Sequence, residues 1–427
     1  MLENVASLRG EGKMPWSEGR VDERKRLIAL WETGSTPTEL SVRFGVSRVT
    51  VYAVIERWLE EEGEAGLEDR SRRPHSNSRQ TSASVTAALL NMKDRYPDYG
   101  PDKLVRLMRD DDVVLSASTA RDILSRNGRV QARRARPPRW SPAVTPKIRV
   151  PGCGHSMSAD HKGEFRMSNG RYCYPLTIAD PASRFVFAVE ALESTAVAPA
   201  IRVFERVFRE WGLPEQIITD NGNPFCSARS LGGLTELSKM WIKLGIQQVR
   251  IQPGRPQQNG VHERMHRTLK KHAVKPPGAN LQAQQRRFDA FLAEFNYIRP
   301  HQSLGQERPA SRVERYRRQY PERIAPIEYP DSFQVRSVRE RGNIKWQGEL
   351  IFVSEVLRGE WVAMQQLDDE QWRLYFGPVH LATWNARTKR FAAPEPQPSE
   401  GLPASPPAPL DPASSPQATV KNVSVDL

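Results

Sequence analysis

The stretch QIITDNG, residues 216–222, decides the fold of the central part of the chain. Residues 217–219 favour a strand, and Asp220 stands where that short apolar strand ends. The Asn-Gly pair that follows is typical of a turn. Because α/β sheets bind their ligands at the carboxyl ends of the strands, we expect Asp220 to border a ligand-binding crevice.

Two more carboxylates occupy comparable settings. Asp160 lies in SADHKGEF, residues 158–165, which we expect to form the first strand of the same domain. Glu263 lies on a helix that the spacing predicts over 258–272. Carboxylate oxygens suit Mg²⁺ or Mn²⁺, and two such ions ~4 Å apart support phosphoryl transfer. We therefore predict that Asp160, Asp220 and Glu263 are catalytic and bind a pair of these ions.

Each of these residues also has an ordinary structural explanation. Glu263 and Arg267 have the spacing of a helix ion pair worth about 0.2–0.5 kcal/mol. Asp220 begins a common turn sequence, and Asp180, in the sequence DPAS, is interpreted as a turn residue. The catalytic interpretation depends on the set of three carboxylates rather than on any one of them.

The helix around Glu263 is predicted to have two distinct faces. Val261, Met265 and Leu269 form an apolar stripe that we expect to face the sheet. The polar residues beside the carboxylate suit a phosphate chain next to a metal ion. The DNA contacts predicted in this region are Asn259, His266, Arg267, Lys270 and Lys271.

The central α/β domain is predicted to cover residues 151–328. The second of its predicted strands, residues 184–191, would place Phe185, Phe187 and Val189 on one face. The following region, 329–390, contains short β-rich runs between Gly and Asp turns and predicts a small β-barrel. The proline-rich residues 391–427 are expected to form a disordered tail.

The N-terminal part is predicted to be all-α. A flexible arm, 1–20, precedes a helix-turn-helix unit, 21–66, in which TPTE (36–39) is a capping box. The second helix of the pair would enter the major groove of DNA, whereas the alternative is a bundle that only packs or dimerises. The predicted contacts in this unit are Ser47, Arg48, Thr50 and Tyr52.

A second helix-turn-helix-like module is predicted at 84–128, between two basic linkers, 67–83 and 129–150. The linkers would follow the DNA backbone, or they would be merely solvated tethers. Their predicted DNA contacts are Arg70, Arg72, Arg73, Arg133, Arg134 and Arg136.

Composition agrees with a nucleic-acid partner. The chain has 427 residues and a net charge of +13, which favours a polyanion. Three cysteines without a CxxC pair, no apolar run of membrane-spanning length and no hydrophobic signal core predict a reduced cytoplasmic protein away from membranes. Neither a GxSxG elbow nor a GxxxxGK loop is present, so serine hydrolysis and nucleoside triphosphate hydrolysis lack support.

Five segments together resemble the integrase-core transposases of bacterial insertion sequences, which are relatives of retroviral integrase with a ribonuclease H-like fold. The resemblance covers about 151–315. Two departures are Met157, where an aromatic residue is usual, and a longer interval between Asp220 and Glu263. The segments are DHKG (160–163), YPLTIAD (174–180), ITDNG (218–222), PGRPQQNGVHER (253–264) and FNYIRPHQSL (295–304).

The resemblance implies that Asp160, Asp220 and Glu263 are a metal-binding triad. It also implies hydrolysis at the donor end and attack of the freed 3′-hydroxyl on target DNA, without a covalent protein–DNA intermediate. The implied partners are double-stranded DNA, as element ends and target, and further copies of the chain in a homo-multimer. A helper protein is left open, and the implied location is the bacterial cytoplasm, at the nucleoid when DNA is bound.

Two other functions compete with a transposase. One is a DNA-binding regulator without catalysis, which loss of a triad carboxylate would have favoured. The other is a metal-dependent nuclease that does not join strands, which would share the triad but would not need two helix-turn-helix modules and a barrel.

Overall fold

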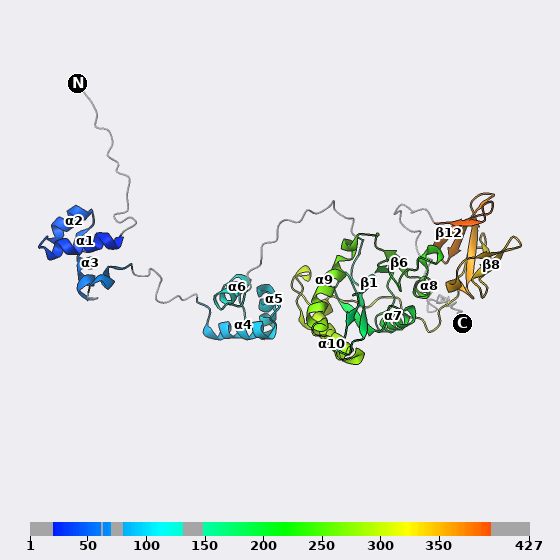
Figure 1. Cartoon of the computed structure of the whole chain (residues 1–427), viewed down its shortest axis with the longest axis horizontal. Coiled ribbons are helices and arrows are strands. Elements are labelled where there is room, and N and C mark those ends of the chain that lie inside the picture. The colour runs from blue at the N-terminus through cyan, green and yellow to red at the C-terminus, as the bar shows by residue number, and fades with distance from the viewer. Residues whose placement is uncertain (1–19, 61–62, 70–79, 131–147, 394–427) are drawn as a thin grey trace, which may run out of the picture. The chain divides into compact units, whose positions relative to one another are not determined.

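The computed structural model describes residues 20–60, 63–69, 80–130 and 148–393 (Figure 1). The chain divides into two units, residues 1–82 and 83–427. The flexible arm predicted at 1–20 lies outside the described residues except for Arg20. Most of the two basic linkers lies outside them as well, including Arg70, Arg72, Arg73, Arg133, Arg134 and Arg136.

The first unit confirms the predicted three-helix arrangement. Thr36 and Glu39 form the expected capping box at the start of the second helix, and Gly45 ends that helix with φ of 62°. Leu27, Leu40 and Val51 are buried where the helices meet. The elements are α1 (Arg20–Glu32), α2 (Pro37–Phe44), α3 (Arg48–Glu60) and the short η1 (Glu64–Leu67).

The second unit begins with another three-helix module, close to the bounds predicted for it. Leu89, Leu104 and Leu124 belong to its buried core. The hydroxyl of Tyr99 donates to Glu294 Oε1 at 2.9 Å, so the module contacts the domain that follows. Its elements are α4 (Ala83–Arg95), α5 (Pro101–Met108), η2 (Arg109–Asp111) and α6 (Ala117–Arg126).

The α/β domain is built on a mixed six-stranded sheet in the order β2-β3-β1-β5-β6, with β4 paired to β3. Strands β1, β3 and β4 are antiparallel neighbours, whereas β5 and β6 run parallel to β1. The strands are β1 (Ser156–His161), β2 (Phe165–Arg166), β3 (Tyr172–Ala179), β4 (Val186–Leu192), β5 (Gln216–Thr219) and β6 (Gln247–Arg250).

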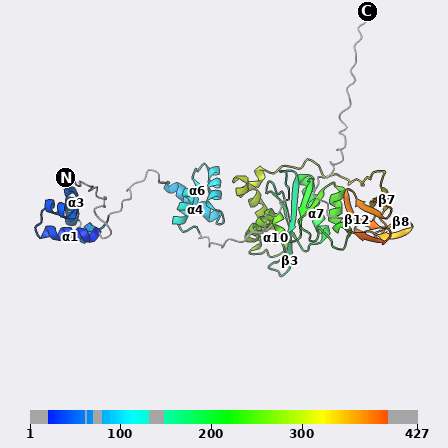
Figure 2. The ribbon, with the colours of Figure 1, turned by 90° about the horizontal axis from the view of Figure 1, so that it is seen from above.

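Helices cover both faces of this sheet (Figures 1 and 2). Phe204 of α7 and Trp241 of α8 belong to the apolar core on one face. Met265 of α9 and Phe288 of α10 belong to the core on the other face. The helices are α7 (Val197–Trp211), η3 (Leu231–Gly233), α8 (Glu236–Lys243), η4 (Pro256–Asn259), α9 (Gly260–Leu269), η5 (Lys270–Val274), α10 (Leu281–Ala293), η6 (Glu294–Ile298), η7 (Gln302–Leu304) and η8 (Pro309–Ser311).

One strand face differs from the sequence prediction. Phe185 and Phe187 lie in the core with α7, as expected for one face, but Val189 lies in the core with α9 and α10. The pairing with β3 shifts by one residue within β4, since Ile178 opposes Ala188 while Ala179 opposes Val186. Such a bulge inserts an unpaired residue and changes the alternation of side chains.

The C-terminal region is β-rich, as predicted, but a closed barrel is not confirmed. Among the described residues, the strands form a five-stranded antiparallel sheet, β13-β12-β11-β10-β7, and a separate β8-β9 hairpin. Ile242 of α8 belongs to their apolar core, which attaches the region to the α/β domain. The elements are β7 (Gln334–Ser337), β8 (Asn343–Trp346), β9 (Glu349–Phe352), η9 (Glu355–Leu357), β10 (Trp361–Gln366), β11 (Gln371–Phe376), β12 (Val379–Asn385) and β13 (Arg390–Ala392).

Strand β13 corrects the start of the predicted tail, because Phe391 and Ala392 pair with β12. The rest of the predicted tail, from residue 394, lies outside the described residues. A search of the described helices found no segment with the length and apolarity that a bilayer crossing requires.

Candidate active site

Asp160 and Asp220 lie at the same level of the sheet. In the parallel pair of β1 with β5, Ser156 opposes Gln216 and Ser158 opposes Ile218. Asp160 follows Ser158 by two residues, and Asp220 follows Ile218 by two. Because the strands are parallel, both aspartates stand at the carboxyl edge, where the sequence led us to expect a ligand site.

The surroundings of Asp160 are unfavourable to its negative charge. Burial, together with the charges of Asp220 and Glu263, raises the pKa of Asp160 to about 7. The ordinary value for this carboxyl is 3.8. The electrostatic influence of the other two carboxylates indicates that all three share one region, and like-charged carboxylates are a donor set that divalent cations stabilise.

The Asp220 carboxylate is held by the turn that follows it. Its Oδ1 accepts a hydrogen bond from the Gly222 N–H at 3.0 Å. A Cβ added to Gly222 would lie 3.1 Å from the other carboxylate oxygen, so a larger residue here would crowd it. The Asn-Gly turn seen in the sequence therefore orients the carboxylate and leaves space beside it.

Glu263 lies in the first turn of α9, where its side chain is exposed to solvent. Within the part of the chain that the structure describes, no three acidic, histidine or cysteine side chains are already gathered closely enough to hold a metal ion. Asp160 is thus held in β1 and Asp220 by the turn after β5, whereas Glu263 is exposed on α9.

A buried hydrogen-bond network ties β1 to α9 beneath the carboxylates. Thr177 Oγ1 donates to the backbone oxygen of Asp160 at 2.8 Å. The Thr177 Oγ1 atom also lies 3.0 Å from His262 Nε2 and 2.8 Å from His266 Nε2. With its proton donated to Asp160, this hydroxyl oxygen can accept hydrogen bonds from the histidine nitrogens.

Burial favours the neutral form of both rings. It lowers the pKa of His262 to about 4, and burial with the charge of His262 lowers that of His266 to about 2. Ser158 Oγ lies 3.0 Å from His262 Nδ1 and donates its proton to the Ala179 backbone oxygen at 3.2 Å. His266 Nδ1 lies 3.8 Å from Asp160 Oδ2, so the network ends at the predicted catalytic carboxylate.

The DNA contacts predicted around α9 fall into two groups. Arg267 and Lys270 are exposed, as expected for contacts with a backbone. Lys271 is exposed but pairs with Asp98 of the second helical module. His266 and Asn259 are buried, at 8% and 7% exposure, which corrects the expectation that they lie on a solvent-facing side. Helical spacing could not show that His266 is buried in a hydrogen bond with Thr177.

The N-terminal unit presents its predicted contacts on α3. Ser47 is exposed, and its Oγ accepts from the Thr50 N–H at 3.1 Å and so caps the helix. Arg48 is exposed, and Tyr52 has 58% of its surface exposed. Among the described residues, Ser47, Arg48 and Tyr52 are thus exposed, whereas Thr50 is half-buried. Asp180, in contrast, is a turn residue as interpreted, since it accepts from Ala182 N and Ser183 Oγ.

Some residues near the site were not identified from the sequence. Ser158, Thr177 and His262 form the network, and Lys162 is close enough to Asp160 for their charges to interact. Lys162 follows Asp160 in the DHKG segment, which was a usable signal. No sequence signal marked Thr177, because its role depends on strand pairing.

Comparison with known protein families agrees with this geometry. Residues 153–256 and 244–309 match families described as integrase core domain. Residues 18–68 and 50–124 match families described as homeodomain-like domain. The chain is thus similar to integrase cores over residues 153–309 and to homeodomain-like domains over residues 18–124.

Individual relatives resemble only parts of the chain. A protein of the insertion element IS476 from Xanthomonas euvesicatoria, itself uncharacterized, is 26% identical over 163 residues, which are 38% of this chain and 45% of that protein. The Pol polyprotein of feline endogenous virus ECE1 is 36% identical over 104 residues, which are 24% of this chain and 9% of the polyprotein. The chain therefore spans less than half the length of these relatives.

Two solved structures are also similar. The HTLV-2 integrase catalytic core domain in complex with magnesium is 16% identical, with a TM-score of 0.31, covering 39% of this chain and 100% of that one. The simian T-cell lymphotropic virus intasome in complex with a PP2A regulatory subunit is 16% identical, with a TM-score of 0.34, covering 72% and 100%.

Proposed function

We propose that this protein is a transposase that cleaves the ends of a DNA element and joins the freed 3′-hydroxyl to target DNA. The observation that carries the proposal is the register of β1 with β5, which brings Asp160 and Asp220 to the same edge of the sheet, within a region that matches the integrase core. The match to an insertion-element protein favours transposition over the other activities of this class.

Asp160, Asp220 and Glu263 would hold Mg²⁺ or Mn²⁺, with two ions as the expected number. When bound, the ions would activate the attacking oxygen and stabilise the leaving one. The donor set fits, since it offers carboxylate oxygens, with Asp160 on β1 and Asp220 directly after β5. Other residues of the chain would hold the site in place and attract the DNA.

The network below the carboxylates would keep the site in register. Thr177 binds the backbone oxygen of Asp160, and the two histidines connect that strand to α9, which carries Glu263. Movement of α9 away from β1 would leave buried donors and acceptors unpaired, which is costly. The exposed Arg267 and Lys270 would attract the phosphates of the DNA strand to be joined.

Recognition of the element ends is assigned to the helical domains. The exposed face of α3, with Arg48 and Tyr52, would read the DNA, and the second module would make further contacts. Because transposition pairs two ends, we expect a homo-multimer on DNA. The arginines of the two linkers remain proposed backbone contacts.

A strand-joining assay tests the proposal. Linear DNA with the native flanks of the gene would be mixed with supercoiled target in Mg²⁺, comparing wild type, Glu263→Gln and the control Glu210→Gln. Glu210 is an exposed glutamate of α7, on the other face of the sheet. Joined product from wild type and the control alone supports the proposal. Specific binding without cleavage in either metal would favour a regulator, and cleavage without joining would favour a nuclease.

A further inference from the structure

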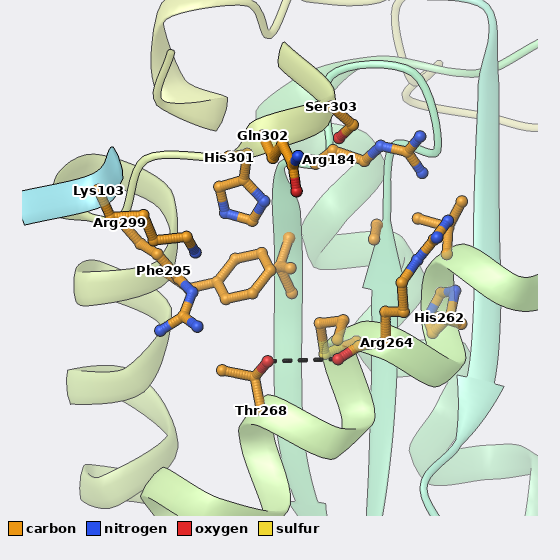
Figure 3. A pocket seen from close by; sticks show the side chains of 14 residues that line it. Lys103, Arg184, His262, Arg264, Thr268, Phe295, Arg299, His301, Gln302 and Ser303 are labelled. Carbon is orange, nitrogen blue, oxygen red and sulfur yellow. Dashed lines mark hydrogen bonds between the residues drawn. The ribbon is translucent and has the colours of Figure 1, made fainter. Parts of the chain in front are cut away.

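A cavity of about 370 Å³ lies on the side of α9 that the triad does not use. Its lining includes Lys103 of α5, Arg184 of the β3–β4 turn, Arg264 of α9 and Arg299. Figure 3 shows Lys103 and Arg299 on one side of the cavity and Arg184 and Arg264 on the other. Among the described residues, no aspartate or glutamate belongs to the lining, which holds four cationic side chains.

Several donors in this lining have no partner among the described residues. Arg184 Nε and Nη1 and Arg299 Nη1 are buried without a hydrogen bond. Buried polar atoms are nearly always paired, and charged ones most of all. Unpaired donors that line a cavity therefore indicate a ligand that accepts hydrogen bonds.

The β3–β4 turn holds Arg184 in position. Arg184 has φ of 66°, and its N–H donates to the Asp180 carbonyl at 2.9 Å. The Asp180 carboxylate accepts from Ala182 N and Ser183 Oγ. The nearest acid in sequence is thus occupied by the turn itself, and the guanidinium extends toward the cavity.

The charges of the lining also disfavour one another. Burial and the charge of Arg299 lower the pKa of Lys103 to about 8, against a weaker opposite effect of Glu294. Burial and the charge of Arg264 lower the pKa of Arg184, against a weaker opposite effect of Asp180. An anion in the cavity would relieve these unfavourable interactions.

We propose that this cavity binds a phosphate of the DNA backbone, outside the catalytic carboxylates. A phosphodiester offers several acceptor oxygens to guanidinium groups, which bind phosphate in a bidentate manner. Arg264 directly follows Glu263 on α9, so a phosphate held here would set the position of the strand relative to the triad. The inference rests on the proposed function, since it takes DNA as the substrate.

The test uses the full-length protein without divalent metal and a labelled duplex at a series of KCl concentrations. Variants Arg184→Gln and Lys103→Gln are compared with Arg202→Gln, an exposed arginine of α7 on the opposite face. We expect each pocket variant to bind about tenfold more weakly and to lower the salt slope by about 0.9, as for one lost phosphate contact. Arg202→Gln should stay within about twofold of wild type.

Melting temperature separates ligand binding from a structural role. Lys103→Gln removes a cation that others repel, so its melting temperature should be equal to or above that of wild type while binding weakens. If Arg184→Gln is unfolded, DNA binding by Lys103→Gln and by Arg184→Lys tests the pocket instead. Arg184→Lys keeps the charge of the side chain. Pocket variants that bind DNA like Arg202→Gln would overturn the proposal.

A second probe identifies the source of the phosphate. Inorganic pyrophosphate should raise the melting temperature of wild type more than that of Arg184→Gln, and duplex should compete for the site. Pyrophosphate protection without any effect of the variants on DNA binding would replace DNA with a free phosphate ligand.

If wild type joins strands but the variants bind normally, only the pocket inference fails. If wild type binds DNA through the pocket but never joins strands, only the proposed function fails.

Discussion

Asp160 and Asp220 stand sixty residues apart in the chain, and the register of β1 with β5 places them at the same level of neighbouring strands. Every pair in that register has this same offset, from Ser156 with Gln216 to Ser158 with Ile218. Asp160 lies in β1 and Asp220 directly follows β5, so strand pairing sets the level of both. Burial, and next the charge of Asp220, raise the pKa of Asp160.

Replacing Asp220 by Asn should abolish strand joining while leaving DNA binding nearly intact. The amide keeps the size of the side chain but removes a negative ligand of the proposed metal site. Joining in Mg²⁺ and duplex affinity would be measured on the same preparation. Full joining activity in this variant would eliminate Asp220 from the triad.

The stability of the metal-free protein should depend on pH through Asp160. Its pKa is about 7 in the folded state and ordinarily 3.8, so the folded protein holds this proton more tightly than the unfolded chain does. Below pH 3.8 the carboxyl is protonated and does not lower the free energy of unfolding. Above pH 7 its negative charge lowers that free energy in full, by about 4 kcal/mol as an upper limit.

Asp160→Asn removes this cost. The melting temperature of the variant minus that of wild type should rise between pH 4 and pH 8, measured in a metal chelator. A difference that stays constant over this range would show that the carboxylate is not disfavoured. Added Mg²⁺ should stabilise wild type at pH 8 and have little effect on the variant.

Thr177→Val should loosen the connection between β1 and α9. The substitution keeps the shape of the side chain but leaves the Asp160 carbonyl and two histidine donors without their shared partner. We expect a loss of about 1–3 kcal/mol in unfolding free energy, measured by urea titration, and a larger fall in joining than in DNA binding.

Thr383→Val provides the matched control for Thr177. Thr383 also hydrogen-bonds a histidine, His380 at 3.2 Å, but in the C-terminal sheet and partly exposed. Loss of the Thr383 hydroxyl should lower strand joining only as far as it lowers the fraction of folded protein. Equal effects of the two variants on joining would reduce Thr177 to a purely structural residue.

Arg48→Ala should weaken binding to the element ends by about 1–3 kcal/mol if the guanidinium reads a base. Affinity for the ends and for an unrelated duplex would be compared, because a base contact affects only the first. An unchanged affinity and footprint would move recognition to the second helical module.

Local sequence determined the elements of this protein and the class of its domains. The strand Gln216–Thr219 and the helix Val197–Trp211 follow from short-range apolar patterns, and the capping box at Thr36 fixed where α2 begins. The three carboxylates and their settings were also visible, because Asp160 lies within a strand, Asp220 directly follows one and Glu263 lies in the first turn of a helix.

Long-range pairing decided the rest. The extra residue in β4 moved Val189 to the opposite face, and Thr177 drew His266 inward from a position that helical spacing assigned to solvent. The level of Asp160 with Asp220 and the gathering of Lys103, Arg184 and Arg299 around one cavity depend on residues far apart in the chain. Periodicity reports only the neighbours along one element, whereas these positions arise from hydrogen bonds and burial between elements.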